Sequence, residues 1–259
     1  VAAALTLGCR EAVPASLRTA YQDTGAIHVL AVSGLHVGLV YLALSGLLRF
    51  LPPIRHRRRL EMAGCLTGVW TFVAVTGLPP SAVRAGAMFS FFILGRTFFR
   101  QSNAFNTLAA SAFCLLLIQP RLLFDVGFQL SYAAVAGIIA LQPLLYRAWF
   151  PPWAVPDYLW KLISVSIAAQ IGTLPLSLHY FHQFPTYFWL SGLIAVPAAG
   201  VILGGGLLLL LLQALPGSAA FLGRLLGGVI ECLNTAIDRI AALPGGQIEG
   251  IWLEGPLVA

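Results

Sequence analysis

The sequence contains very few charged residues. Of its 259 residues, 15 are Lys or Arg and 9 are Asp or Glu, together 9%, whereas soluble domains carry about 25%. So few charges cannot cover a water-soluble globule of this size, and the 59% of hydrophobic residues excludes a disordered chain. Apolar runs of helix length, without strand alternation, predict an all-α integral membrane protein rather than a barrel.

Several chemical motifs are also missing. The only lysine, Lys161, is not part of a GxxxxGK[ST] motif, and neither a dinucleotide fingerprint nor a haem CxxCH is present. The four cysteines form no CxxC, so we interpret them as small core residues. His179 and His182 stand three residues apart without an HExxH motif, and we interpret them as interfacial histidines rather than metal ligands. The sequence therefore predicts neither cofactor nor metal.

Eight apolar stretches are separated by proline and glycine breakers. They cover about 26–51, 60–78, 80–99, 103–119, 122–146, 159–179, 187–214 and 219–243. We expect a single domain over 1–259: a lead-in at 1–25 with a short interfacial amphipathic helix at 11–24, then a bundle of about eight spans at 26–259. Pro175 and Pro197 predict broken or kinked spans. Because the sequence does not begin with Met, we expect a fragment or a cut-out domain, and a natural truncation stays open.

The basic residues predict an orientation. Most basic residues between the expected spans fall on one side of the bundle, which the positive-inside rule assigns to the cytoplasm. These residues are Arg55, Arg57, Arg58, Arg59, Arg96, Arg100, Arg147, Lys161 and Arg224. Both chain ends are then expected outside the cytoplasm.

The first polar cluster within an apolar run is HVLAVSGLH, which contains His28, Ser33, Gly34 and His36. Ser33 and His36 are three apart and would share a helical face, while Gly34 and Gly38 would allow close helix approach. Three interpretations are open: a tight helix crossing, the lining of a path or site, and catalysis by Ser33 and His36.

The second cluster begins the third apolar stretch and contains Ser81 and Arg84. One interpretation is an arginine that extends to lipid headgroups. The other is a permanent positive charge that faces a phosphate or an acidic partner.

Two further clusters lie in later stretches. Asp125, Gln129 and Tyr132 have helical spacing and predict a polar stripe, with Ser131 beside it. A polar stripe in a span should face protein or water rather than lipid. Gln170 begins a polar patch that ends at Pro175. Helix–helix hydrogen bonding and a cavity lining are both open for these clusters.

In this order, the clusters resemble the competence domain of the ComEC family of bacterial DNA-uptake channels. The segments that carry the resemblance are LGCREAVPASLRTAYQDTG at 7–25, TGAIHVLAVSGLHVGLV at 24–40, GLPPSAVRAGAM at 77–88, LLFDVGFQLSYAAVAGI at 122–138 and AAQIGTLPLSLHYFHQFPTYFWLSGLIAVP at 168–197. The resemblance covers nearly the whole chain. One departure is Gly192, where the family often has Asn, so no role of that amide is carried over.

The resemblance implies a non-enzymatic helical domain in the bacterial cytoplasmic membrane that passes single-stranded DNA inward during natural transformation. Its implied partners are the DNA strand, membrane lipid, an extracytoplasmic DNA receptor and a separate cytosolic ATPase. Flanking OB-like and metallo-β-lactamase-like domains would complete the full-length protein. The expected wall of the DNA path, or polar structural core, consists of His28, Ser33, Gly34, His36, Ser81, Arg84, Asp125, Gln129, Ser131, Gln170 and Pro175.

Two alternatives remain. A small-solute transporter would also have broken helices and polar groups near the membrane midplane. An intramembrane hydrolase would need Ser33, His36, Asp125 or the histidines at 179 and 182 to come within hydrogen-bonding reach of one another.

Overall fold

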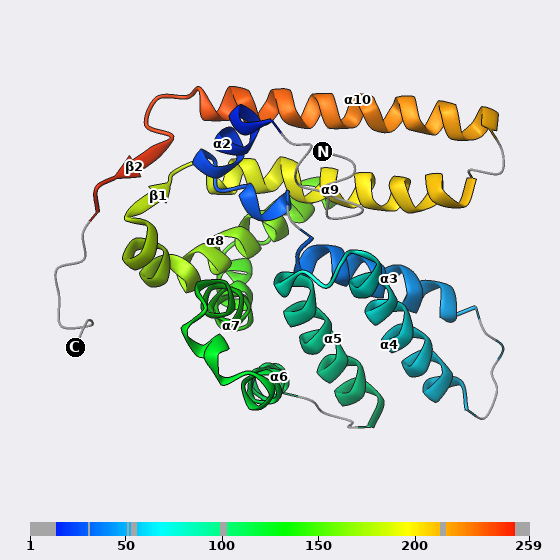
Figure 1. The fold of residues 1–259 in the computed structure, drawn as a ribbon. Helices are drawn as coiled ribbons and strands as arrows, with labels where there is room; N and C mark the ends of the chain where they lie inside the picture. Colours follow the sequence, from blue (N-terminus) through cyan, green and yellow to red (C-terminus); the bar gives the residue numbers. More distant parts are fainter. Residues whose placement is uncertain are drawn as a thin grey trace. The chain divides into compact units, whose positions relative to one another are not determined.

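The computed structural model describes residues 14–30, 32–50, 52, 56–98, 103–212 and 216–251. These ranges are largely helical, which confirms the all-α prediction (Figure 1). The α-helices are α2 (Ala15–Asp23), α3 (Gly34–Leu48), α4 (Arg57–Val75), α5 (Pro80–Phe98), α6 (Ala104–Ile118), α7 (Val126–Arg147), α8 (Ala154–Phe181), α9 (Phe188–Leu211) and α10 (Pro216–Ala241). Two 3₁₀ turns are η1 (Ile27–Val29) and η2 (Pro120–Phe124). Cys9, Arg10, Arg55 and Arg100 lie outside the described residues.

Each predicted apolar stretch overlaps one of the helices α3 to α10, and the predicted lead-in helix corresponds to α2. Four of the described helices are long and apolar enough to cross a membrane: Val126–Arg147, Ala154–Phe181, Phe188–Leu209 and Ser218–Ala241. The helices α3 and α6 are apolar but have only 15 residues each.

The predicted start of one helix was wrong, and the two prolines expected to break or kink spans do not break them. The first predicted span does not begin as a helix at residue 26, because Ser33 is the extended N-cap of α3 and residues 27–29 form η1. Pro175 and Pro197 do not interrupt α8 and α9, which run through them. A proline removes one helical hydrogen bond, whereas ending the helix would leave several backbone groups without partners in an apolar environment.

A short two-stranded sheet was not predicted. The strands β1 (Gln183–Pro185) and β2 (Gln247–Glu249) pair antiparallel, with Phe184 opposite Ile248. His182 ends α8 with a φ of 53°, in the left-handed region, and so turns the chain into β1. Strands of three residues are too short for an alternating pattern to identify in sequence.

The chain divides into two compact units. Unit 1 includes residues 28–128 and 198–230, and unit 2 includes 14–27, 129–197 and 231–251. In unit 1, α3, α4 and α5 pack around a buried apolar core that includes Val37, Val69 and Val73 (Figure 1). The glycine pair of α3 faces α5, since a Cβ at Gly34 would lie 3.7 Å from the Cβ of Ala85. Gly34 therefore allows α5 to approach, whereas a Cβ at Gly38 would lie 3.1 Å from the ring of Phe89.

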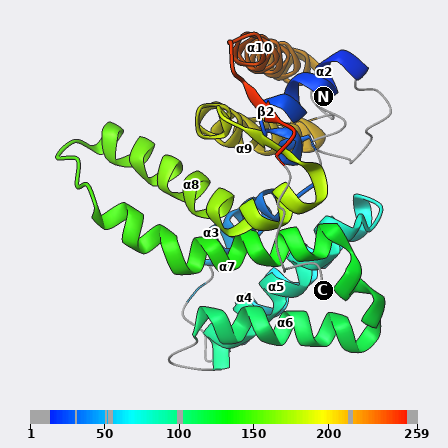
Figure 2. The same cartoon turned by 90° about the vertical axis from the view of Figure 1, so that its left-hand side faces the viewer.

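In unit 2, α7 and α8 form an antiparallel hairpin (Figure 2) whose backbones meet at two glycines. A Cβ at Gly137 would lie 2.8 Å from the Cα of Gly172 and 2.6 Å from the carbonyl oxygen of Ala168. The packing also accounts for Gly192, because a Cβ there would lie 2.9 Å from Oγ of Ser166. The small side chains thus set the spacing of these helices.

The lead-in helix α2 is bonded to the rest of unit 2. The hydroxyl of Tyr21 donates to Oδ1 of Asn234 on α10 at 3.0 Å. Oγ of Ser191 on α9 donates to the backbone carbonyl of Thr24 at 2.6 Å. Tyr21 and Thr24 are buried. These hydrogen bonds and buried side chains therefore hold α2 and the residue after it against α9 and α10.

Candidate functional site

Five of the residues predicted from sequence lie together in unit 1, where the N-terminal ends of α3, α5 and α7 meet. We call Ser33, His36, Ser81, Arg84 and Asp125 the polar cluster. They come from three segments that are far apart in the sequence, as a site assembled by folding requires.

Ser33 and His36 form the N-terminal end of α3. Nδ1 of His36 lies 3.1 Å from Oγ of Ser33 and accepts a hydrogen bond from the Ser33 backbone N–H at 3.3 Å. Because Nδ1 accepts, the proton of the neutral ring resides on Nε2. His36 is completely buried, and its Nε2 has no hydrogen-bond partner among the described residues.

Ser81 and Arg84 occupy the first turn of α5. Oγ of Ser81 donates to the backbone carbonyl of Val32 at 2.6 Å and so ties α5 to the segment before α3. Arg84 is only 7% exposed, and its Nη1 lies 3.5 Å from Oδ1 of Asp125. A buried guanidinium close to a carboxylate excludes the interpretation of Arg84 as a freely snorkelling side chain.

Asp125 has two partners. Besides Arg84, its Oδ1 accepts from the backbone N–H of Phe128 at 2.7 Å and so caps the start of α7. Gly127 lies against this pair: a Cβ there would be 3.1 Å from Nη2 of Arg84 and 3.2 Å from Oδ1 of Asp125. Gly127 was not predicted as a site residue, although it stands two residues after Asp125.

The cluster is suited to attract an anion. Three helix N-termini meet there, and each has a partial positive charge. Arg84 adds a full positive charge, whereas the side chain of Asp125 is half-exposed and offsets it. The result is a weakly positive polar region that can attract a phosphate group without binding it tightly.

The other predicted residues have separate surroundings. His28 is exposed in η1, outside any α-helix. Gln129 on α7 accepts a hydrogen bond from the hydroxyl of Tyr180 on α8 at 2.9 Å. The predicted stripe of Asp125 and Gln129 on one helix is wrong, because Asp125 precedes the first turn of α7. Ser131 lies on α7, and Gln170 and Pro175 lie on α8, all within unit 2.

The catalytic interpretation finds limited support in this geometry. Ser33 and His36 are in contact, but the contact is the local cap of a helix. No described carboxylate forms an ion pair with His36, and the described residues contain no group of three His, Cys, Asp or Glu suited to a metal. His179 packs edge-on against the Tyr180 ring at 4.9 Å between centroids.

Comparisons with known proteins place the chain in a family. Residues 5–259 match the sequence model of a family described as Competence protein. ComE operon protein 3 of Bacillus subtilis (strain 168) is 33% identical over 238 residues, which are 92% of this chain and 29% of that protein. An uncharacterized protein of Aquifex aeolicus (strain VF5) is 30% identical over 231 residues, 88% of this chain and 52% of that protein.

A further relative is the uncharacterized protein YcaI of Escherichia coli (strain K12), 27% identical over 203 residues, 74% of this chain and 26% of that protein. The chain thus spans about a quarter to a half of the length of these relatives. No solved structure matches it.

Proposed function

Because the chain belongs to the Competence protein family, we propose that it is the membrane part of a DNA-uptake machine. In this proposal it passes a single DNA strand across the bacterial cytoplasmic membrane during natural transformation. The observation that carries the proposal is the buried Arg84 at three helix N-termini, within a chain that matches the family over residues 5–259.

The polar cluster fits the chemistry of such cargo. A DNA strand carries one negative charge per nucleotide, and a conduit must attract each phosphate and then release it. Arg84 and the helix N-termini supply the attraction. Asp125, 3.5 Å from Arg84, reduces the net charge, so that successive phosphates exchange rather than remain bound.

Other predicted wall residues would contribute hydrogen bonds and stacking surfaces. His28, Gln129, Ser131, Gln170 and Pro175 belong to this proposed wall. The ring of Tyr180, whose hydroxyl bonds Gln129, offers an aromatic face on which a base can stack.

The proposal includes a membrane topology and partners. All eight helices α3 to α10 cross or enter the bilayer, with both chain ends on the outer face, as the arginine distribution favours. A cytosolic ATPase supplies the energy, and an extracytoplasmic receptor delivers the DNA. The OB-like and metallo-β-lactamase-like domains flank this chain in the full-length protein.

A transformation assay with labelled duplex DNA tests the proposal. In cells that express Arg84→Gln, we expect internalised strand to fall about tenfold, since loss of one charged phosphate contact removes about 1.4 kcal/mol. Surface-bound DNA and the amount of membrane-inserted protein should not change. Arg84→Lys should retain more uptake than Arg84→Gln, and the control Arg121→Gln, at an exposed arginine of η2, should behave as wild type.

Two results would contradict the proposal. Normal internalisation of DNA by cells with correctly inserted Arg84→Gln protein would show that Arg84 takes no part in DNA passage. Normal internalisation after deletion of the whole gene would refute DNA passage and favour the small-solute transporter.

A further inference from the structure

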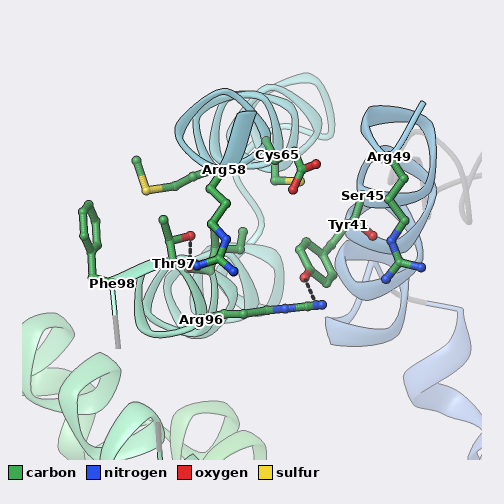
Figure 3. A pocket seen from close by; sticks show the side chains of 11 residues that line it. Tyr41, Ser45, Arg49, Arg58, Cys65, Arg96, Thr97 and Phe98 are labelled. Carbon is green, nitrogen blue, oxygen red and sulfur yellow. Dashed lines mark hydrogen bonds between the residues drawn. The ribbon is translucent and has the colours of Figure 1, made fainter. Parts of the chain in front are cut away.

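A pocket of about 620 Å³ lies in unit 1 (Figure 3). Its lining residues lie at the opposite end of α3 and α5 from the polar cluster. The last turns of α3 and α5 and the first turns of α4 form its walls. Arg84 and Arg96 are 12 residues apart on α5, about 18 Å along the helix, so the pocket and the polar cluster are distinct.

Three arginines give the pocket a strong positive charge. Arg49, Arg58 and Arg96 line it from α3, α4 and α5 (Figure 3). Nη1 of Arg96 donates to the hydroxyl of Tyr41 at 3.2 Å, which fixes this guanidinium at the pocket wall. No described carboxylate forms an ion pair with any of the three arginines.

The one carboxylate in the wall is already neutralised. Oε1 of Glu61 lies 2.6 Å from Nε of Arg57, and Nη2 of that arginine also donates to the Arg49 carbonyl at 2.9 Å. Arg57 is therefore engaged within the protein and compensates Glu61. An excess of three positive charges remains available to a ligand.

Large apolar side chains are exposed at the same helix ends. Phe98, a pocket residue, is 62% exposed, and Leu47 and Phe50 at the end of α3 are 67% and 87% exposed. Arginines beside exposed apolar side chains are typical of the level where a membrane protein meets lipid headgroups. A nucleic-acid strand would cover the charges but would leave these apolar surfaces in water.

We propose that this pocket binds the phosphate of an anionic phospholipid of the cytoplasmic leaflet. Arg58 and Arg96 hold the phosphate, Tyr41 orients Arg96, and the acyl chains lie along the exposed apolar side chains at the rim. Basic pockets between membrane helices on the cytoplasmic side suit such headgroups. The site rests on the proposed membrane topology but not on the proposed DNA passage. Its excess of positive charge distinguishes it from the polar cluster, where Asp125 offsets Arg84.

Native mass spectrometry of the purified protein in detergent tests this site. Phosphatidylglycerol and phosphatidylcholine of identical acyl chains are added in turn, and the bound fraction of each is measured. We expect wild type to retain phosphatidylglycerol in clear preference. The variant Arg58→Gln/Arg96→Gln should bind phosphatidylglycerol about 25-fold more weakly, because each arginine contributes about a fivefold factor, or about 1 kcal/mol.

The matched control is Arg147→Gln/Arg224→Gln, which removes the same charge at described arginines outside the pocket and should bind lipid as wild type does. Circular dichroism of each variant verifies that its helices are intact. A third titration uses a single-stranded oligonucleotide as ligand.

Three outcomes would overturn the inference. The first is that wild type binds both lipids equally. The second is that the pocket variant and the control variant lose the same amount of affinity for phosphatidylglycerol. The third is loss of oligonucleotide binding in the pocket variant while phosphatidylglycerol binding persists, which would assign the pocket to the DNA strand.

Discussion

Replacement of Asp125 by Asn separates the two roles of its carboxylate. The side chain caps α7 through Phe128 and faces the guanidinium of Arg84. Asn caps a helix about as well as Asp, so Asp125→Asn removes the charge interaction alone. Asp125→Ala removes both interactions. The difference in the free energy of unfolding between the two variants therefore measures the contribution of the cap.

The structure sets the size of the charge effect. Two unit charges 3.5 Å apart interact by about 5 kcal/mol at an effective dielectric constant of about 20. The side chain of Asp125 is 50% exposed, whereas that of Arg84 is 9% exposed, so water screens part of this interaction. The value should lie between that of an exposed pair, about 0.2–1 kcal/mol, and that of a buried pair, about 3–5 kcal/mol. We therefore expect about 1–3 kcal/mol for the pair and about 1 kcal/mol more for the cap.

A double-mutant cycle measures the pair. The free energy of unfolding is determined in mixed micelles by SDS titration, with far-ultraviolet circular dichroism, for wild type, Arg84→Gln, Asp125→Asn and the double variant. We expect a coupling of about 1–3 kcal/mol. A coupling below about 0.5 kcal/mol, the usual error of additivity for independent sites, would refute the ion pair as a structural element of the cluster.

Two further variants test packing and titration by the same unfolding assay. Gly137→Ala should destabilise the protein by about 1–3 kcal/mol, because the added methyl group meets Gly172. Gly227→Ala is the control: its added methyl group would meet no neighbouring atom within 4 Å, and the substitution should stabilise the protein by up to about 1 kcal/mol. Equal effects of the two substitutions would contradict the close contact at Gly137. Burial and then the charge of Asp238 raise the pKa of the Tyr21 hydroxyl above its ordinary 10.0. The folded state therefore favours the neutral hydroxyl, so its contribution to the free energy of unfolding is fully present below pH 10 and is lost as the pH rises above 10. Tyr21→Phe should make the free energy of unfolding depend less steeply on pH in this alkaline range. An unchanged slope in Tyr21→Phe would contradict the raised pKa.

Much of the fold could be predicted from the sequence because apolar runs of helix length are strong signals. Each predicted stretch overlaps a helix, and the glycine pair of α3 lies against residues of α5. The start of the first span could not be placed, since residues 26–32 are as apolar as the helix that follows. Only the cap at Ser33, a local hydrogen-bond preference, marks the boundary.

The residues of the polar cluster were singled out from the sequence, but their arrangement was not predicted. The contact between Ser33 and His36 follows from their spacing, and the structure shows it at 3.1 Å. The Arg84–Asp125 pair joins residues 41 positions apart in the sequence, and no local pattern identifies such a partner. Helical periodicity instead predicted that Asp125 and Gln129 share a stripe on one helix. This prediction failed because Asp125 precedes the helix and caps it.

The shortness of α3 and α6 affects how the surrounding lipid must pack. At about 1.5 Å per residue, 15 residues extend about 22 Å, well below the roughly 30 Å of a hydrocarbon core. Before α3, the non-helical backbone is shielded by protein, since Val29 and Val32 are at most 1% exposed and the Val32 carbonyl accepts from Ser81. If α3 and α6 cross the bilayer, as proposed, the lipid beside these two helices must thin locally, and a charged polymer that passed there would meet a shorter low-dielectric barrier than an undisturbed bilayer imposes.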